Sequence, residues 1–319
     1  MYGITALGEL LIDFTEHGLS ASGMRLFEQN PGGAVANLVY AAARLGERVA
    51  FIGKVGNDMH GQFLKKFMQD GGVDTRGMVI TDDVFTTLAF VALDNGERAF
   101  SFARKPGADT CLRPDELDEA LLKITRILHI GSLSLCDEPV RAATHKAIDI
   151  AKKAGAIISY DPNYRASLWR SRDEAIEQMR SVLPFVDVMK LSDEETVLLT
   201  DCQDPEEALA HLSGFGIACV AVTMGAKGAM VRTKGETVHV PGFICEAVDT
   251  TGAGDAYFGG FLYSLLQSGR TLSELSIDDA ATFARFGNAV AALCIGKRGG
   301  MPAMPALEQV EALLQPNNR

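Results

Sequence analysis

Short apolar runs of strand length alternate with longer helical patterns over most of this chain. Strand–helix alternation of this kind favours a parallel sheet with helices covering both faces. The expected strands are Ile4–Leu7, Val49–Gly53, Ile127–Gly131, Ala156–Tyr160, Val186–Leu191 and Ile217–Thr223, and the helical patterns include Ala34–Leu45, Gly61–Gln69, Val140–Lys153 and Asp173–Val182.

Two segments in the N-terminal third break this alternation. Residues 13–30 are polar and have no helical period. Thr86–Leu93 and Glu97–Arg104 are joined by Asp94-Asn95-Gly96. Asn-Gly between two alternating runs predicts a β-hairpin, because both residues tolerate positive φ. An extension of the main sheet is one interpretation, but the position of both segments in one third of the chain favours a small separate lid.

The charge of the chain limits its partners. Its 319 residues include 30 Lys and Arg against 41 Asp and Glu, a net charge of −11. This disfavours nucleic acid and anionic membranes, which are bound by clustered positive charge, and no apolar run approaches the roughly 18 residues of a membrane span.

The six histidines form no H-E-x-x-H pattern, and the six cysteines no C-x-x-C pair. Without a secretory pattern at the start, we expect a cytoplasmic protein.

The most informative stretch is Asp249–Phe261, which holds a glycine turn followed by a helical pattern from Ala256 onward. Gly252 and Gly254 permit a tight turn, and a turn at a helix N-terminus is a site for an anion. Asp255 would repel that anion, so its presence needs a reason. It fits a general base that accepts the proton of a hydroxyl attacking the γ-phosphoryl group. A simple N-capping aspartate is the alternative.

This stretch resembles the C-terminal signature of the ribokinase-like sugar kinases, the PfkB family. The N-terminal signature of the family is matched by Gly32-Gly33-Ala34-Val35-Ala36-Asn37 and by Gly53-Lys54-Val55-Gly56-Asn57-Asp58. The resemblance runs from Gly8 to Pro305 and implies an ATP-dependent carbohydrate kinase. The implied fold is a ribokinase-like three-layer α/β/α sandwich with a small β-sheet lid. The core would span residues 1–12, 33–84 and 106–319, and the lid residues 13–32 and 85–105.

The resemblance assigns nucleotide and metal roles to several residues. The anion hole and base would be Gly252, Ala253, Gly254 and Asp255, and the other ATP-binding residues Thr223, Gly225, Lys227, Gly228 and Asn288. Glu195 would act on Mg²⁺ through water, although Ser192 replaces the Asn of the family's N-x-x-E motif. Relatives that bind K⁺ beside the anion hole imply Asp249 and Thr251 as potassium ligands.

On the sugar side, the resemblance implies Asp13, Gly32, Gly33, Asn37, Arg104 and Arg165 together with Asp255. The string from Arg104 to Asp109 follows the R-x-P-x-A-D pattern of fructokinases and aminoimidazole riboside kinases. Ala103 stands where fructokinases often carry an aromatic residue. The expected substrate is fructose, with 2-keto-3-deoxygluconate, aminoimidazole riboside and ribose as alternatives. A non-catalytic sugar or nucleotide sensor is the alternative from another class, and a homodimer through the lid is a further implication.

Overall fold

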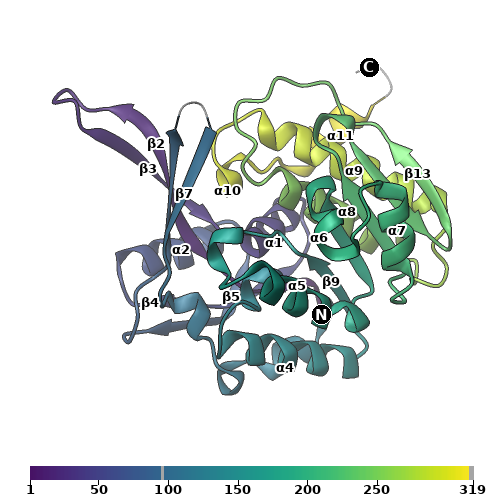
Figure 1. The fold of residues 1–319 in the computed structure, drawn as a ribbon, viewed down its shortest axis with the longest axis horizontal. Helices are drawn as coiled ribbons and strands as arrows, with labels where there is room; N and C mark the ends of the chain where they lie inside the picture. The colour runs from purple at the N-terminus through teal and green to yellow at the C-terminus, as the bar shows by residue number, and fades with distance from the viewer. Residues whose placement is uncertain (95–96, 316–319) are drawn as a thin grey trace.

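The structure is a computed structural model and describes residues 1–94 and 97–315. A large α/β body carries two hairpins that project from one edge (Figure 1). The sheet of the body has the strand order β13-β12-β11-β10-β9-β8-β1-β4-β5, parallel except for β12 and β13. Its strands are β1 (Tyr2–Leu7), β4 (Val49–Gly56), β5 (Asp74–Thr81), β8 (Thr125–Gly131), β9 (Ile157–Asp161), β10 (Val188–Ser192), β11 (Cys219–Thr223), β12 (Ala229–Thr233) and β13 (Glu236–Val240).

Both faces of this sheet are buried. In β4, Val49 and Phe51 belong to the core on one face, whereas Ala50 and Ile52 belong to the core on the other. Such alternation follows from the two-residue period of a strand. One face packs against α1 (Ala34–Arg44), α2 (Met59–Asp70), α8 (Ala253–Ser268), α9 (Ile277–Ile295) and α11 (Leu307–Leu314), and the other against α3 (Glu119–Lys123), α4 (Val140–Lys153), α5 (Arg172–Ser181), α6 (Asp193–Thr200) and α7 (Pro205–Ser213). The predicted three-layer sandwich is confirmed.

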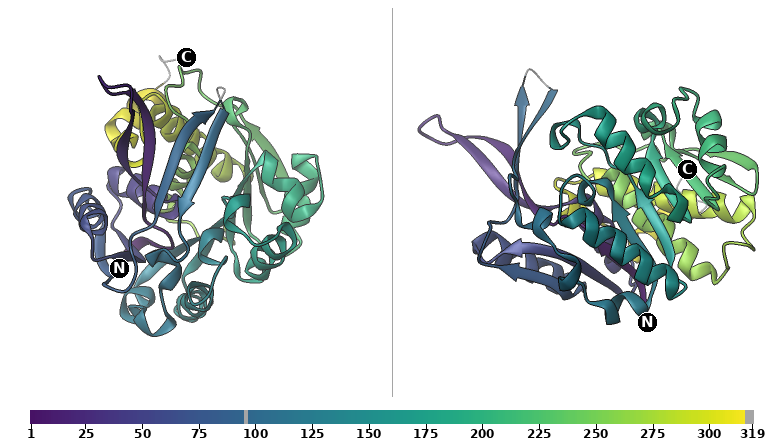
Figure 2. Two further views of the ribbon diagram at one scale, coloured as in Figure 1. Left: turned by 60° about the vertical axis from the view of Figure 1, so that its left-hand side comes forward. Right: turned by 60° about the horizontal axis from the view of Figure 1, so that its bottom comes forward.

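A second sheet lies apart from the first and has the order β3-β2-β6-β7. It is built from two hairpins, which project away from the body in the right-hand view of Figure 2. Its strands are β2 (Leu11–Leu19), β3 (Arg25–Gly32), β6 (Leu88–Asp94) and β7 (Glu97–Ala103). The odd segments therefore form a separate small sheet rather than an extension of the large one. The predicted Asn95-Gly96 turn lies outside the described residues.

The lid sheet is attached at the carboxyl edge of the main sheet. β1 ends at Leu7 and β2 begins at Leu11, so the chain passes directly from a core strand into the lid. In open α/β sheets, ligands bind at the carboxyl ends of the strands. The fold therefore places a candidate site between this edge and the lid. Among the described helices, none combines the length and the apolar character that a membrane span requires.

Candidate active site

The glycine turn before α8 forms a helix N-terminus at the carboxyl edge of the sheet. Gly252 has φ 77°, a left-handed conformation that favours glycine, and it caps α8. α8 begins at Ala253, three residues earlier than the helical pattern indicated, so Asp255 lies in its first turn. The amide groups of a first turn carry the positive end of the helix dipole. The turn can therefore receive an anion, with a carboxylate beside it.

Asp255 is buried, with 7% of its surface exposed. Its Oδ2 accepts a hydrogen bond of 2.8 Å from Nδ2 of Asn37 in α1, and its Oδ1 a longer one of 3.4 Å from Nδ2 of Asn163 after β9. Burial raises the pKa of Asp255 to about 6, against the lowering effect of the Asn37 hydrogen bond and of the Lys190 and Arg165 charges. The carboxyl group is therefore mainly ionised at neutral pH, and its pKa lies close enough to 7 for it to accept and release a proton.

Asp255 opens into a cavity of about 180 Å³ that the core and the lid share. Asp13, on lid strand β2, lines the same cavity together with Asn37, Arg165 and Gly33. Burial raises the pKa of Asp13 to about 7, while Arg165 lowers it. Drug-sized pockets occupy about 300–1,000 Å³, so this cavity suits a smaller molecule. Carboxylates, amides and a guanidinium facing one small space suit a molecule rich in hydroxyl groups.

The double glycine keeps the backbone close to this cavity. A Cβ atom on Gly32 would lie 2.0 Å from Oδ2 of Asp13, and one on Gly33 would lie 2.4 Å from the carbonyl oxygen of Glu9. Gly33 also has φ 113°, which favours glycine. Oε1 of Glu9 accepts a hydrogen bond of 2.7 Å from the backbone N–H of Ala34 and holds the start of α1. Side chains at these glycines would therefore displace Asp13 and the turn.

A larger groove of about 640 Å³ lies at the opposite edge of the sheet. It is lined by Tyr2, Arg48 and Asp74, at the amino ends of β1, β4 and β5. This is the edge at which α/β sheets rarely bind ligands. The smaller cavity at Asp255 is therefore the candidate active site.

Two charged residues near the glycine turn, Lys190 and Asp161, were not identified as site residues from the sequence. Nζ of Lys190 in β10 lies 2.9 Å from Oδ2 of Asp161 at the end of β9, and both side chains are buried. Asp161 was noted only as part of a motif, and Lys190 only as a member of an expected strand. A lysine within the apolar run of residues 186–191 was the available signal.

Glu195 lies next to this pair, and its carboxylate is engaged by the backbone. Oε2 accepts a hydrogen bond of 2.8 Å from the N–H of Ser192, which completes a capping box at the start of α6. Oε1 accepts one of 2.7 Å from the N–H of Tyr164. Each carboxylate oxygen has a second lone pair, so water can still be bound. Nowhere in residues 1–94 and 97–315 do three metal-ligating side chains come together.

The residues expected to bind ATP gather around the end of β11. Thr223 ends this strand, and Gly225 and Gly228 have φ of 56° and 91° in the turn that follows. Nδ2 of Asn288 in α9 donates hydrogen bonds of 3.1 Å to the carbonyl groups of Val240 and Pro241. The amide thus holds the end of β13 and the residue after it against α9. The side chain of Lys227 is exposed.

Asp249 joins the glycine turn to the loop after α9. Its Oδ1 accepts hydrogen bonds from the N–H and Oγ1 of Thr251, at 2.9 and 2.8 Å, and its Oδ2 accepts one of 3.0 Å from the N–H of Gly299. The backbone of Val248 and Asp249 donates to the carbonyl of Ile295. The glycine turn and the loop after α9, which are the two segments that would surround a potassium ion, are therefore in contact.

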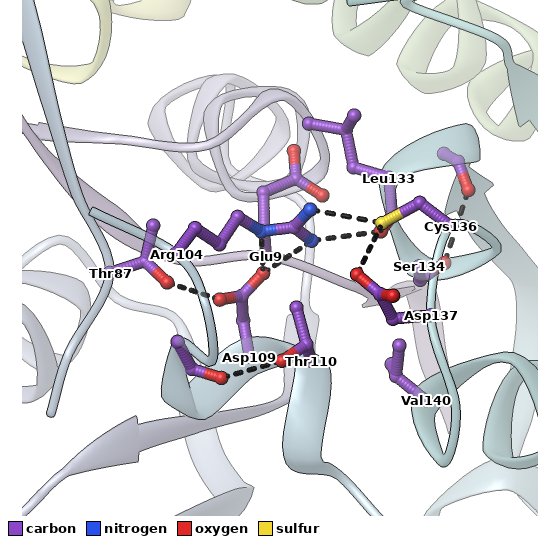
Figure 3. A network of polar contacts seen from close by, with 12 residues as sticks. Glu9, Thr87, Arg104, Asp109, Thr110, Leu133, Ser134, Cys136, Asp137 and Val140 are labelled. Carbon is purple, nitrogen blue, oxygen red and sulfur yellow. Dashed lines mark hydrogen bonds and ion pairs between the residues drawn. The ribbon is translucent and has the colours of Figure 1, made fainter. Parts of the chain in front are cut away.

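Arg104, which is predicted to contact the sugar, is bound by the core at the base of the lid. Its guanidinium donates hydrogen bonds from Nε to Oδ2 of Asp109 (2.8 Å), from Nη1 to Sγ of Cys136 (3.0 Å) and from Nη2 to the carbonyl of Leu133 (2.8 Å), as Figure 3 shows. Thr87, which precedes lid strand β6, also donates to Asp109. Arg104 follows lid strand β7 and does not line the cavity. Together with Asp109, it anchors both ends of the β6–β7 hairpin to the core.

Comparison with known proteins agrees with this geometry. A model of the pfkB family of carbohydrate kinases matches residues 1–307. The chain is 39% identical to "Fructokinase-1" of Zea mays over 98% of its own length and 97% of that protein. It is also similar to a fructokinase of Xylella fastidiosa with bound ATP (35% identity, 99% of each chain, TM-score 0.91). A fructokinase of Vibrio cholerae O395 with fructose, ADP and calcium has 33% identity and a TM-score of 0.88, over 98% of this chain and 99% of that one. The family model matches nearly the whole length of the chain, and the glycine turn and its aspartate are intact. The chain therefore belongs to the pfkB family of carbohydrate kinases.

Proposed function

We propose that the protein is an ATP-dependent fructokinase, which transfers the γ-phosphoryl group of ATP to a hydroxyl of fructose. The observation that carries the proposal is the position of Asp255, buried at a helix N-terminus and open to a cavity that Asp13 also lines. The Vibrio and Xylella relatives support the choice of fructose and ATP. The proposal therefore names fructose as the substrate of this member of the family.

The residues of the site divide the work of the reaction. Asp13, Asn37 and Arg165 would hold the sugar so that one hydroxyl points at Asp255. Asp255 accepts the proton of that hydroxyl while the hydroxyl oxygen of the sugar forms a bond to the γ-phosphorus. The bond between that phosphorus and the leaving oxygen of ADP breaks. The first turn of α8 faces the charge on the transferred group. The lid closes the cavity, which keeps water from acting as the acceptor.

Magnesium belongs to the proposal as a partner of ATP. When bound, it neutralises charge on the phosphate oxygens. Glu195 and Asp161 are the buried acids that would hold its water shell, because both act on Lys190, whose ammonium lies beside Gly254 of the glycine turn. The calcium ion of the Vibrio complex supports the use of a divalent ion.

We predict that kcat/KM for fructose exceeds that for ribose and for 2-keto-3-deoxygluconate by at least about tenfold, or ~1.4 kcal/mol in transition-state binding. Fructofuranose offers one primary hydroxyl to Asp255 and further hydroxyls to Asp13, whereas ribose has fewer groups to satisfy the lid side. A panel of sugars with MgATP and a coupled ADP-release assay measures this ranking. A keto acid or a riboside ranked first would contradict the choice of fructose and leave the kinase in place.

The same assay separates the kinase from its alternative in another class, a non-catalytic sugar or nucleotide sensor. A sensor would bind ADP and release none from ATP with any sugar. A base beside a phosphate site has no use in a sensor, and the observed contacts of Asp255 with Asn37 and Asn163 hold it in the cavity.

We predict that potassium raises kcat severalfold above the value in sodium at equal ionic strength. A fructokinase of Vibrio cholerae O395 with fructose and ADP holds potassium, and here Asp249 and Thr251 join the glycine turn to the Gly299 loop. An ion at this place would add positive charge behind the anion hole. Initial rates in potassium and sodium chloride test it, with Asp249→Asn expected to remove the difference. Equal wild-type rates in the two salts would exclude the site.

Two further proposals concern the state of the protein in the cell. The lid hairpin exposes apolar residues, with Leu19 64% and Met24 67% exposed, which supports a homodimer formed through the lid. Sedimentation of the protein would reveal a monomer if this is wrong. Buried free thiols at Cys136, Cys219 and Cys294 suit the reducing cytoplasm, a location that fractionation of cells would test.

A further inference from the structure

The groove of about 640 Å³ at the amino ends of β1, β4 and β5 takes no part in the proposed reaction. We call it the amino-edge groove. Its volume lies within the range of about 300–1,000 Å³ that is typical of ligand pockets. The substrates of an α/β enzyme bind at the carboxyl ends of the strands. A molecule in the amino-edge groove would therefore be a second ligand, separate from the reacting sugar and ATP.

Positive charge exceeds negative charge in this groove. Arg48, Lys65 and Arg76 line it together with a single carboxylate, that of Asp74. This carboxylate is already paired, because Nε of Arg76 donates a hydrogen bond of 2.9 Å to its Oδ2 and the hydroxyl of Tyr2 donates to the same oxygen. Three cations and one carboxylate leave the groove with two positive charges in excess.

The side chains of Arg48 and Lys65 carry this excess. Within residues 1–94 and 97–315, neither side chain forms an ion pair or a hydrogen bond. The acids close to them in sequence are engaged elsewhere. Oε1 of Glu47 accepts the backbone N–H of Arg48 at 2.9 Å, and Asp70 pairs with Lys66 at 2.7 Å. Since the chain has 41 acidic and only 30 basic residues, a shortage of acids does not explain two unpaired cations in one groove.

Tyr2 holds the guanidinium of Arg48 at the groove. The tyrosine is 1% exposed, and Cζ of Arg48 lies 4.6 Å from the centroid of its ring. Cζ of Arg76 lies 5.6 Å from the same centroid. A cation–π contact is an attraction to the face of the ring and requires no hydrogen-bond acceptor. The N–H donors of Arg48 are therefore available for a phosphate, which a guanidinium can bind through two parallel hydrogen bonds.

The rest of the groove suits a part of the ligand that carries hydroxyl groups. Nε2 of Gln69 donates a hydrogen bond of 2.8 Å to Oγ1 of Thr75, which leaves the side-chain carbonyl of Gln69 as an acceptor. Val73 and Met78 add apolar surface to the lining. The groove thus offers cations for a phosphate, acceptors for hydroxyl groups and apolar surface for carbon atoms.

We propose that the amino-edge groove is a binding site for a sugar phosphate, whose phosphate is held by Arg48 and Lys65 and whose hydroxyl groups face Gln69. The site is additional to the proposed kinase reaction and does not depend on it. The competing interpretation is a group of solvated surface cations that binds no small molecule.

The chain offers a control with the same change of charge on the same helices. Arg44 in α1 and Lys66 in α2 are exposed and do not line the groove. Arg48→Gln with Lys65→Gln is therefore compared with Arg44→Gln with Lys66→Gln and with the wild type. Both double variants lose two positive charges, but only the first loses them from the groove.

The measurement is titration calorimetry with glucose 6-phosphate in saturating ADP and fructose, which occupy the proposed active site and cannot react together. We expect the wild type and the control variant to bind glucose 6-phosphate equally. The groove variant should bind at least about tenfold more weakly, because each lost contact is a hydrogen bond between charged groups. Inorganic phosphate should bind more weakly than the ester, and glucose should show no binding.

A single variant covers the case in which the groove variant is unstable. Arg48→Gln removes the contact with the Tyr2 ring, so thermal melting is recorded for every protein. Lys65→Gln removes no ion pair or hydrogen bond that the described residues make, and it should weaken glucose 6-phosphate binding severalfold with an unchanged melting temperature.

The inference is overturned if the wild type does not bind glucose 6-phosphate, if the groove variant binds it as well as the wild type, or if the control variant loses as much affinity. Binding of inorganic phosphate without binding of the ester would contradict the choice of a sugar phosphate. A wild-type protein that phosphorylates no sugar would contradict the proposed function and leave these binding results intact.

Discussion

Replacing Asp255 by Asn is expected to lower kcat by about 10²–10⁴-fold, the range for loss of a general base. The amide keeps the shape of the side chain in the cavity but cannot accept the proton of the sugar hydroxyl. ATP binding should stay close to wild type, because the hydroxyl rather than the nucleotide is the partner of this group. Steady-state kinetics with fructose, combined with calorimetric ADP binding, measures both quantities.

Asp279 provides the matched control for this variant. It is the third residue of α9 after the cap Ser276, as Asp255 is the third residue of α8 after Gly252. An acid in the first turn of a helix stabilises it by about 0.3–1 kcal/mol. Asp279→Asn should therefore reduce thermal stability slightly and leave kcat unchanged. If Asp255→Asn behaves in the same way, with turnover retained within a factor of a few, Asp255 is only a helix-capping residue.

The pH dependence of kcat/KM provides a second measurement of the base. Burial raises the pKa of Asp255 to about 6 and that of Asp13 to about 7, and the ionised form of each is the one that accepts hydrogen bonds from the sugar. Activity should therefore be lost as the pH falls through 7 and 6. With two groups required, log(kcat/KM) approaches a slope of about 2 at low pH, and Asp13→Asn reduces it to about 1. If kcat/KM stays constant between pH 6 and pH 7, the reaction does not depend on the ionisation of Asp255 or of Asp13.

The parts of the fold that the sequence predicted well are those with a strong local pattern. Helix α4 begins and ends at the predicted residues Val140 and Lys153, and α1 ends one residue early at Arg44. β4 is apolar except for Lys54 and buried along its length, so its composition alone indicated a central strand. The glycine turn was equally local, because its glycines and its aspartate lie within four residues.

The strands that no local periodicity indicated depend on partners distant in sequence. β5 is polar at its start, where Asp74 accepts a hydrogen bond from the hydroxyl of Tyr2, and it is a strand because it pairs with β4. β2 and β3 contain the polar residues 13–30 and are held by pairing with each other and with β6. Periodicity cannot indicate such strands, because their stability comes from the neighbouring strand rather than from an apolar face.

The same distinction applies to the site. Asp13, Asn37 and Asp255 were identified through motifs, whereas Lys190 reaches Asp161 because β10 pairs with β9 in a register that sets Met189 opposite Tyr160. Register between strands is a tertiary property. The contacts of Arg104 with Asp109 and with the carbonyl of Leu133 also depend on how the lid hairpin packs on the core, and its contact with the sugar stays a prediction.

Gly254→Val is expected to abolish measurable activity while the protein still folds. The Cβ atom alone would lie 2.8 Å from Nζ of Lys190, and the two methyl groups of valine would occupy the space that a phosphate needs at the first turn of α8. The backbone of Gly254 is helical, and the displaced atom is the end of a flexible side chain, so the fold can adjust. A coupled assay, thermal melting and ADP binding together measure the effect.

Gly214→Val is the control, because Gly214 also has a helical backbone with φ −63° and lies exposed at the end of α7. It should melt somewhat lower than wild type and keep full turnover. Gly254→Ala should fall between wild type and valine, since it adds the Cβ atom without the branches. If the Gly254→Val protein melts like the wild type and still phosphorylates fructose at the wild-type rate, the phosphate is bound elsewhere. Loss of ADP binding with adenosine binding intact would instead place the phosphate chain at this turn, which is the geometry that a base at Asp255 requires.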